Sequence, residues 1–106
     1  MNKVSLTGHF GGIEAYTDTT VKETNIINWK DKQVRGINYV CSTLVFDRGF
    51  IDVYIPKSYR EILFADDRLS GSVIVEGNLE TEVGRGTGIV RNFITADCVT
   101  NTISEM

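Results

Sequence analysis

Hydrophobic and polar side chains alternate over most of this chain, and a repeat of two residues predicts β-strands that bury one face. The first run covers residues 3–16, in which Val4, Leu6 and Phe10 are separated by polar side chains. Gly11-Gly12 lies within the same run and predicts a bend, because glycine allows a strand to curve sharply. We therefore expect one long, curved strand near the start of the chain.

Two more alternating runs lie in the middle of the chain, at residues 37–46 and 50–55. The residues Asp47-Arg-Gly49 between them predict a hairpin with a three-residue turn and a left-handed Gly49. Alternation along this hairpin then defines one aromatic face, made of Phe46, Phe50 and Tyr54 with Ser42 and Asp52. The opposite face is aliphatic and is the predicted core, made of Val45, Ile51, Val53 and Ile55.

A helix and two further strands complete the pattern. Pro56 ends a strand, and Ser58-Tyr-Arg-Glu61 forms a capping box that predicts a short helix over residues 58–66. Strands at about residues 72–81 and 88–100 follow, joined by a glycine-rich hairpin loop. Three strands, one helix and two strands are the elements of an OB-fold in order. We therefore predict that the whole chain is one all-β domain, a five-stranded OB-fold barrel with the helix between the third and fourth strands.

A polar, threonine-rich segment separates the first two of these barrel strands, at residues 17–34. Its Lys30-Asp-Lys-Gln33 cluster predicts a turn between a short, exposed pair of strands. The segment also contains Trp29, the single tryptophan of the chain. A tryptophan in a polar segment has little core to bury into, so three roles stay open: base stacking, a cap on the barrel end, or a dimer contact.

Composition narrows the classes of function. The 106 residues include 11 basic and 14 acidic side chains, a net charge of −3, so a nucleic-acid site would depend on local positive charge. No apolar run approaches the roughly 18 residues that span a bilayer, and the N-terminus does not resemble a signal peptide. We expect a cytoplasmic protein that does not bind membranes.

Candidate chemistry is sparse. Two cysteines and one histidine have no zinc-site spacing, so we expect reduced thiols, no metal and no cofactor. No grouping of nucleophile and base is apparent, because the lone His9 has no cysteine or serine placed to act beside it. We therefore expect a protein that is not an enzyme and that has no small-molecule substrate.

Three segments carry a resemblance to a known family. Asn2-Lys-Val-Ser-Leu-Thr-Gly8, Gly71-Ser-Val-Ile-Val-Glu-Gly-Asn-Leu-Glu-Thr81 and Ile94-Thr-Ala-Asp-Cys-Val99 resemble the first, fourth and fifth strands of the single-stranded DNA-binding proteins of bacteria and phages. The resemblance implies an OB-fold that binds single-stranded DNA with little sequence preference during replication, recombination or transfer of a mobile element. It also implies a homodimer or homotetramer, and it leaves RNA binding open.

Three departures from that family shape the expectation, and one of them is the unusual segment at residues 17–34 that contains Trp29. The turn at Asp47-Arg-Gly49 is much shorter than the family's long basic hairpin, and the chain ends at Ile103-Ser-Glu-Met106 without the family's acidic tip. We therefore expect a reduced form that does not recruit other enzymes through such a tip, or a relative such as the primosomal replication protein n. A protein-interaction or assembly module with weak or no DNA binding is the alternative function.

Single-strand binders need aromatic rings that stack on bases and cations that contact phosphates. By the resemblance, Phe50 stands where the family has a base-stacking residue, and Tyr54 follows on the same face. Trp29 is the third aromatic candidate. The candidate cations lie on predicted strands and hairpin tips, and they are Arg35, Arg48, Lys57, Arg85 and Arg91. The alternative is that the aromatic face packs in a subunit interface and that each cation is an ordinary surface charge.

Overall fold

The computed structural model of the chain describes residues 2–16, 21–24, 29–59, 71–84 and 86–101. The strands are β1 (Lys3–Tyr16), β2 (Val21–Thr24), β3 (Lys30–Val34), β4 (Ile37–Phe46), β5 (Gly49–Pro56), β6 (Ser72–Val83) and β7 (Val90–Asn101). Residues 57–59 form a helical turn directly after β5, where the sequence predicts a helix to begin. The remainder of that predicted helix lies outside the described residues.

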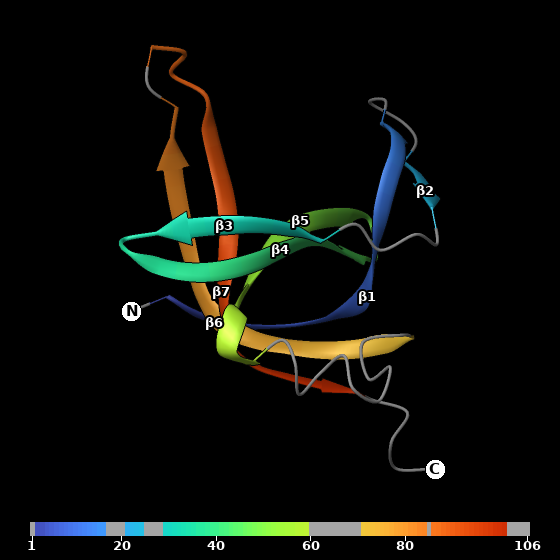
Figure 1. Ribbon diagram of the computed structural model, residues 1–106. Helices are drawn as coiled ribbons and strands as arrows, with labels where there is room; N and C mark the ends of the chain where they lie inside the picture. Colours follow the sequence, from blue (N-terminus) through green and yellow to red (C-terminus); the bar gives the residue numbers. More distant parts are fainter. Residues whose placement is uncertain (1, 17–20, 25–28, 60–70, 85, 102–106) are drawn as a thin grey trace.

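Five of these strands close into a ring (Figure 1). Around the ring β1 pairs with β4, β4 with β5, β5 with β7, β7 with β6, and β6 again with β1. The pairs are antiparallel except β5 and β7, which are parallel. This strand order is that of the OB-fold, so the predicted all-β, five-stranded barrel is confirmed.

β1 closes the barrel by changing its partner at His9, which pairs with β6 on one side and with β4 on the other. The preceding Gly8 lies so close to β4 that a Cβ atom there would be 2.3 Å from the carbonyl oxygen of Val45. A side chain at this position would push the two strands apart. The crossing therefore requires a residue without a Cβ atom.

β2 and β3 extend the sheet beyond the ring. β2 pairs with the far end of β1, and β3 pairs with the first half of β4. The expected exposed pair of strands is therefore wrong in its pairing, and residues 30–33 are part of β3 and not a turn. The turn is Arg35-Gly36, whose φ angles of 49° and 79° are both positive, as a two-residue turn of type I′ requires. We call residues 30–38 the β3–β4 arm.

The turn between β4 and β5 is one residue shorter than predicted. Val45 pairs with Phe50 and Phe46 with Gly49, which leaves the two-residue turn Asp47-Arg48 with a positive φ of 66° at Arg48. A change of one residue moves side chains to the opposite face, so Phe50 shares a face with Val45 and not with Phe46. The predicted common face of Phe46 and Phe50 is therefore wrong. Phe50 and Tyr54 still share one face of β5, because they are separated by an even number of residues.

The inside of the ring is filled by aliphatic side chains. The buried core consists of Phe10, Val40, Leu44, Val53, Ile55, Val73, Val75, Ile94, Ala96 and Val99. Ile51 packs against it, so three of the four predicted core residues of the hairpin lie there. The shorter turn reverses the other assignments: Ser42 pairs with Val53 and shares its inner face, whereas Val45 is on the outer one.

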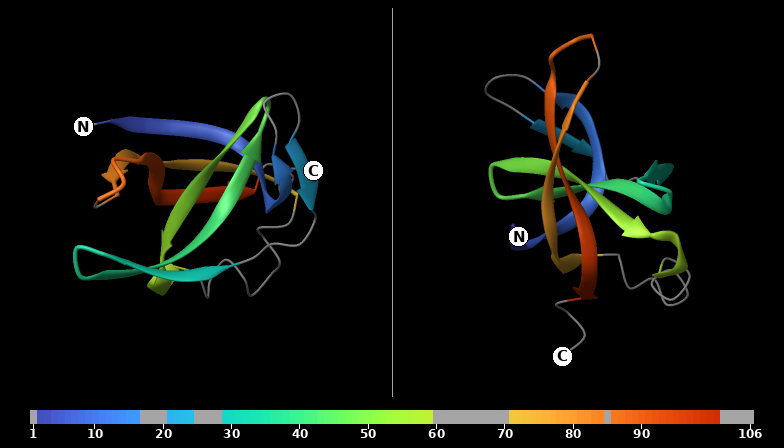
Figure 2. Two further views of the ribbon diagram at one scale, coloured as in Figure 1. Left: turned by 90° about the horizontal axis from the view of Figure 1, so that it is seen from above. Right: turned by 90° about the vertical axis from the view of Figure 1, so that its left-hand side faces the viewer.

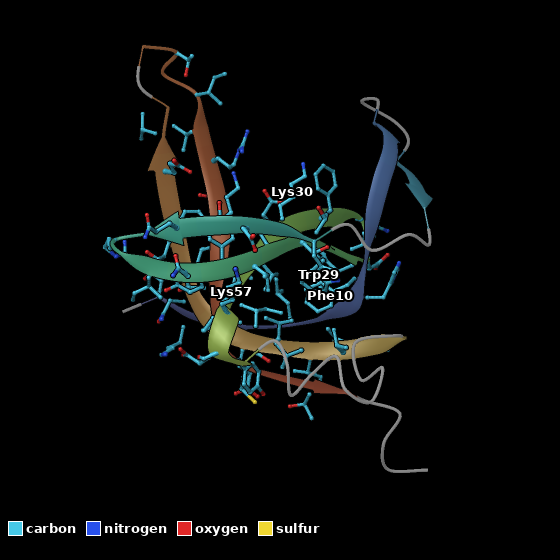
Figure 3. All side chains as sticks on the ribbon, in the orientation of Figure 1. Phe10, Trp29, Lys30 and Lys57 are labelled. Carbon is cyan, nitrogen blue, oxygen red and sulfur yellow. The ribbon has the colours of Figure 1, made fainter. Side chains whose placement is uncertain are left out.

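Trp29 also packs against this core, close to the bend of β1 (Figure 3). Its ring centroid lies 5.2 Å from that of Phe10, with an angle of 50° between the ring planes. Figure 3 shows the two labelled side chains next to each other. Of the three roles open for Trp29, this position matches the cap on the barrel end.

Candidate nucleic-acid interface

A second, smaller hydrophobic cluster lies outside the ring, on the outer faces of β4, β5 and β7. It consists of Tyr39, Cys41, Tyr54 and Phe93, which we call the aromatic cluster. Cys41 and Tyr54 are cross-strand partners, and Phe93 comes from the parallel neighbour of β5. The Tyr54 and Phe93 rings are stacked, with centroids 4.5 Å apart and planes 23° apart, and Tyr39 lies 6.1 Å from Tyr54 at a steeper tilt.

The β3–β4 arm keeps this cluster away from solvent. Val34 of the arm packs against the rings, and Tyr54 and Phe93 are each only 4% exposed. Figure 2 shows from two directions how the arm and the β6–β7 hairpin project from the ring. Between them lies a groove of about 410 Å³, which we call the outer groove, lined by Lys32, Gln33, Val34, Arg35, Tyr54, Glu80, Thr81, Glu82 and Phe93.

Three cations face the aromatic cluster. Lys30 and Lys32 pair with Cys41 and Tyr39, so alternation places both lysines on the outer face of the arm. Burial raises the pKa of the Cys41 thiol to about 12, and the charge of Asp52 adds to this, whereas the charges of Lys32, Lys30 and Arg91 act in the opposite direction. The charges of these three side chains are therefore near enough to Cys41 to affect the pKa of its thiol.

Acidic groups share the same surface. Burial is the main cause that raises the pKa of Tyr54, and the charges of Glu82 and Asp52 contribute to the shift. Asp52 also accepts a hydrogen bond from Thr43 at 3.3 Å. The field over the outer groove is therefore mixed, with cations on the arm and on β7 and carboxylates on β5 and β6.

One ion pair connects the tip of the arm to β6. Arg35 Nη2 donates to Glu80 Oε1 at 2.6 Å, and Thr95 Oγ1 donates to the other oxygen, Glu80 Oε2, also at 2.6 Å. The Thr95 hydrogen bond is the first cause, and Arg35 a further one, of a pKa of Glu80 below its usual 4.5. Glu80 therefore stays ionised at neutral pH and holds the arm against the barrel.

The structure brings together only part of the sequence-predicted site. Tyr54 and Arg35 line the outer groove, and Arg91 pairs across the sheet with Glu82 beside it. Phe50 lies on the same face of β5 as Tyr54 and is 39% exposed. These four side chains can belong to one surface, and they come from β5, β7 and the tip of the arm.

Three of the other four candidates lie elsewhere. Arg48 is at the β4–β5 turn, in a separate hollow that it shares with His9 and Ser72. Lys57 makes an ion pair with Asp31 at 3.5 Å, and in Figure 3 it lies below β3 whereas Lys30 lies above it. Trp29 packs on the core, as described above. Arg85 lies outside the described residues.

Sequence reasoning missed several residues of this surface: Lys32, Tyr39, Glu80 and Phe93, and Lys30 beside them on the same face of β3. Lys30 and Lys32 alternate with Asp31 and Gln33, and this spacing was a signal for a strand with one basic face. Glu80 was not recognisable, because its partners Arg35 and Thr95 are 45 and 15 residues away in the sequence.

The arrangement of the barrel was compared with known proteins. A solved single-stranded DNA-binding protein has a similar fold. It is a small protein from Mycoplasma pneumoniae, 17% identical in sequence, and the two structures superpose with a TM-score of 0.58 over 100% of this chain and 98% of the other. No family model and no curated protein matches the sequence. The similarity therefore establishes the fold of this chain.

Two features are absent from the described residues. No helix there is long and apolar enough to cross a membrane. In the same part of the chain, histidine, cysteine, aspartate and glutamate side chains form no group of three that could hold a metal ion.

Proposed function

We propose that this protein binds single-stranded DNA through the outer groove and the neighbouring face of β5, with little sequence preference. The observation that carries the proposal is the position of the aromatic cluster. OB-folds bind oligonucleotides on their second and third strands and in the loops that follow the first and fourth. In this chain those elements are β4, β5, the β3–β4 arm and the β6–β7 hairpin, which surround Tyr54 and Phe93.

The chemistry of this surface suits a flexible, charged strand. Phe50 offers a partly exposed ring, and stacking of one base on such a ring contributes about 1 to 3 kcal/mol. Lys30, Lys32 and Arg91 lie near enough to the cluster for their charges to affect the Cys41 thiol, and they can follow the phosphates. None of these contacts depends on base identity, because every base has a flat face and every nucleotide a phosphate.

The direct test is fluorescence anisotropy of a labelled oligothymidylate of about 35 nucleotides, with duplex DNA and oligouridylate of the same length as comparisons. We expect binding to the single strand that weakens as salt is raised, and weaker binding to the duplex. Phe50→Leu keeps an apolar side chain but removes the ring, so affinity should fall, and Phe50→Trp should restore it. Absence of binding at low salt would refute the proposed function.

The biological role and assembly belong to the same proposal. We infer a bacterial or phage type of single-stranded DNA-binding protein that acts in replication, recombination or mobile-element transfer, in the cytoplasm. A homodimer or homotetramer is part of the proposal, because β2 and β3 are the edge strands of the sheet among the described residues, and an edge strand can pair with another chain. Size-exclusion chromatography with light scattering measures the number of subunits directly.

A protein-interaction module is the second candidate. Val83, Ile89 and Val90 at the end of the β6–β7 hairpin are each more than 60% exposed, which is unusual for three neighbouring β-branched residues. An apolar hairpin tip suits contact with another protein better than contact with phosphates. If the oligonucleotide does not bind, loss of assembly in a Val83→Ser/Ile89→Ser variant would favour this alternative.

A further inference from the structure

The two partners of the Arg35–Glu80 ion pair differ in their exposure. The Arg35 side chain is 68% exposed at the tip of the β3–β4 arm, whereas the Glu80 side chain is 19% exposed in the outer groove. Glu80 is held on its other oxygen by Thr95, which is itself 6% exposed. The carboxylate is therefore a fixed part of the barrel, and the guanidinium is the accessible partner.

This pair closes the arm over the aromatic cluster. Val34, which directly precedes Arg35, packs on the cluster, so movement of the tip away from Glu80 would also lift Val34 from the rings. A base cannot lie flat on the ring of Tyr54 or Phe93 while each residue is only 4% exposed. Full use of the aromatic cluster by a ligand therefore requires that the arm tip moves.

A phosphate and a carboxylate bind a guanidinium in the same way. Both accept short, charge-assisted hydrogen bonds from its planar set of N–H groups. A nucleic-acid phosphate in the outer groove would thus find Arg35 already engaged by Glu80 at 2.6 Å. It would also meet the negative charge of Glu80 itself.

We propose that Glu80 is an internal competitor for nucleic acid: it holds Arg35, keeps the arm closed over the aromatic cluster, and so limits the affinity of the outer groove. The inference rests on the proposed function. A strand that binds transfers Arg35 from the Glu80 carboxylate to a phosphate. Binding and arm opening are then one event, with the free protein held in the closed form.

The test compares two isosteric substitutions on β6. Glu80→Gln removes the negative charge from the Arg35–Glu80 ion pair, which we call the latch, and its amide oxygen can still accept the Thr95 hydrogen bond. Glu82→Gln is the matched control, because Glu82 lines the same groove two residues further along and loses the same charge. We expect Glu80→Gln to bind labelled oligothymidylate about fivefold more tightly than the wild type, the upper end of what one partly exposed ion pair contributes. Glu82→Gln should tighten binding less than twofold.

The Arg35→Gln background separates the latch from a simple effect of charge. Without the guanidinium there is nothing for Glu80 to hold, so adding Glu80→Gln should gain no more than adding Glu82→Gln does. If Glu80→Gln does not fold by circular dichroism, Glu80→Asp replaces it. The shorter side chain cannot reach both Arg35 and Thr95, so it should also tighten binding.

Each other result overturns the inference. Equal gains from Glu80→Gln and Glu82→Gln would mean that only the local field matters. Weaker binding of Glu80→Gln would mean that Glu80 orients Arg35 toward the phosphate. In both cases the wild type still binds, so the proposed function stands and the latch alone fails. If neither the wild type nor any variant binds, both are refuted.

Discussion

Neutralising the two lysines on the outer face of β3 should make binding of single-stranded DNA measurably less sensitive to salt. Lys30 and Lys32 pair with Cys41 and Tyr39, and their charges reach the Cys41 thiol within the aromatic cluster. Phosphates that pass along the outer groove would lie beside both lysines. The variant Lys30→Gln/Lys32→Gln removes these two contacts and keeps the length and polarity of the side chains close to the original.

The size of the effect follows from counterion release. For single strands, each phosphate contact contributes about 0.7 to the slope of the logarithm of affinity against the logarithm of salt concentration, so two contacts contribute about 1.4. Between about 50 and about 200 mM salt the concentration rises fourfold. The wild type should therefore lose about seven times more affinity over this range than the variant does.

The assay is anisotropy of labelled oligothymidylate at four or five salt concentrations, with a second variant of equal charge change. Arg48→Gln/Lys57→Gln removes two candidate cations that lie in other places: Arg48 at the β4–β5 turn, and Lys57 in an ion pair with Asp31. We expect its slope to stay close to that of the wild type. If this second variant lowers the slope and Lys30→Gln/Lys32→Gln does not, the assignment of the interface to the outer groove is wrong.

Three further predictions concern the barrel. Trp29→Ala should lower the free energy of unfolding by about 2 to 3 kcal/mol, because it removes the packing against Phe10, and urea unfolding followed by circular dichroism measures this loss. The affinity of the variant for oligothymidylate should stay within twofold of the wild type, and a large loss of affinity in the folded variant would contradict this expectation. Gly8→Ala should cost about 2 kcal/mol, because its Cβ atom would meet the Val45 carbonyl oxygen, and an unchanged urea midpoint would show that the strands separate easily. The pKa of Glu80 in the folded protein lies below its usual 4.5, so ionised Glu80 stabilises the fold fully above about pH 4.5, and this stabilisation is lost as the pH falls further. The urea midpoint should therefore decrease more between about pH 6 and about pH 3.5 for the wild type than for Glu80→Gln.

The alternation of residues was enough to predict the strands of the barrel, because each has one face in a common core. Residues 3–16 are one strand as expected, and the ends of β6 and β7 lie within two residues of the predicted ends. The order of strands and helix then left few topologies open. For these elements, local pattern and tertiary structure agree.

The turns were harder to predict, because a short loop sequence fits more than one length. Asp47-Arg-Gly49 is compatible with a two- or a three-residue turn, and the difference changes which face Phe46 occupies. β3 was missed for another reason. Both of its faces are polar and mostly exposed, so it has no buried side that would show as a hydrophobic period, and only its pairing with β4 makes it a strand.

The candidate site depends on contacts that no local pattern contains. Tyr54 meets Phe93 because β5 and β7 are parallel neighbours, although 39 positions separate the two residues in the numbering of the chain. Arg35 meets Glu80 across the outer groove for the same kind of reason. Sequence reasoning therefore found individual aromatic and basic residues but could not determine which of them share a surface.

The negative net charge of the chain is unfavourable for binding nucleic acid. The outer groove suggests how a protein with this net charge could still bind a negatively charged strand. Lys30, Lys32 and Arg91 act on the aromatic cluster from the arm and from β7, while Arg35 is neutralised by Glu80 as long as the arm is closed. Opening the arm would release the Arg35 charge at the moment when a phosphate arrives. The positive field of this surface would then depend on its conformation, and neither total charge nor a map of the closed form measures what a bound strand meets.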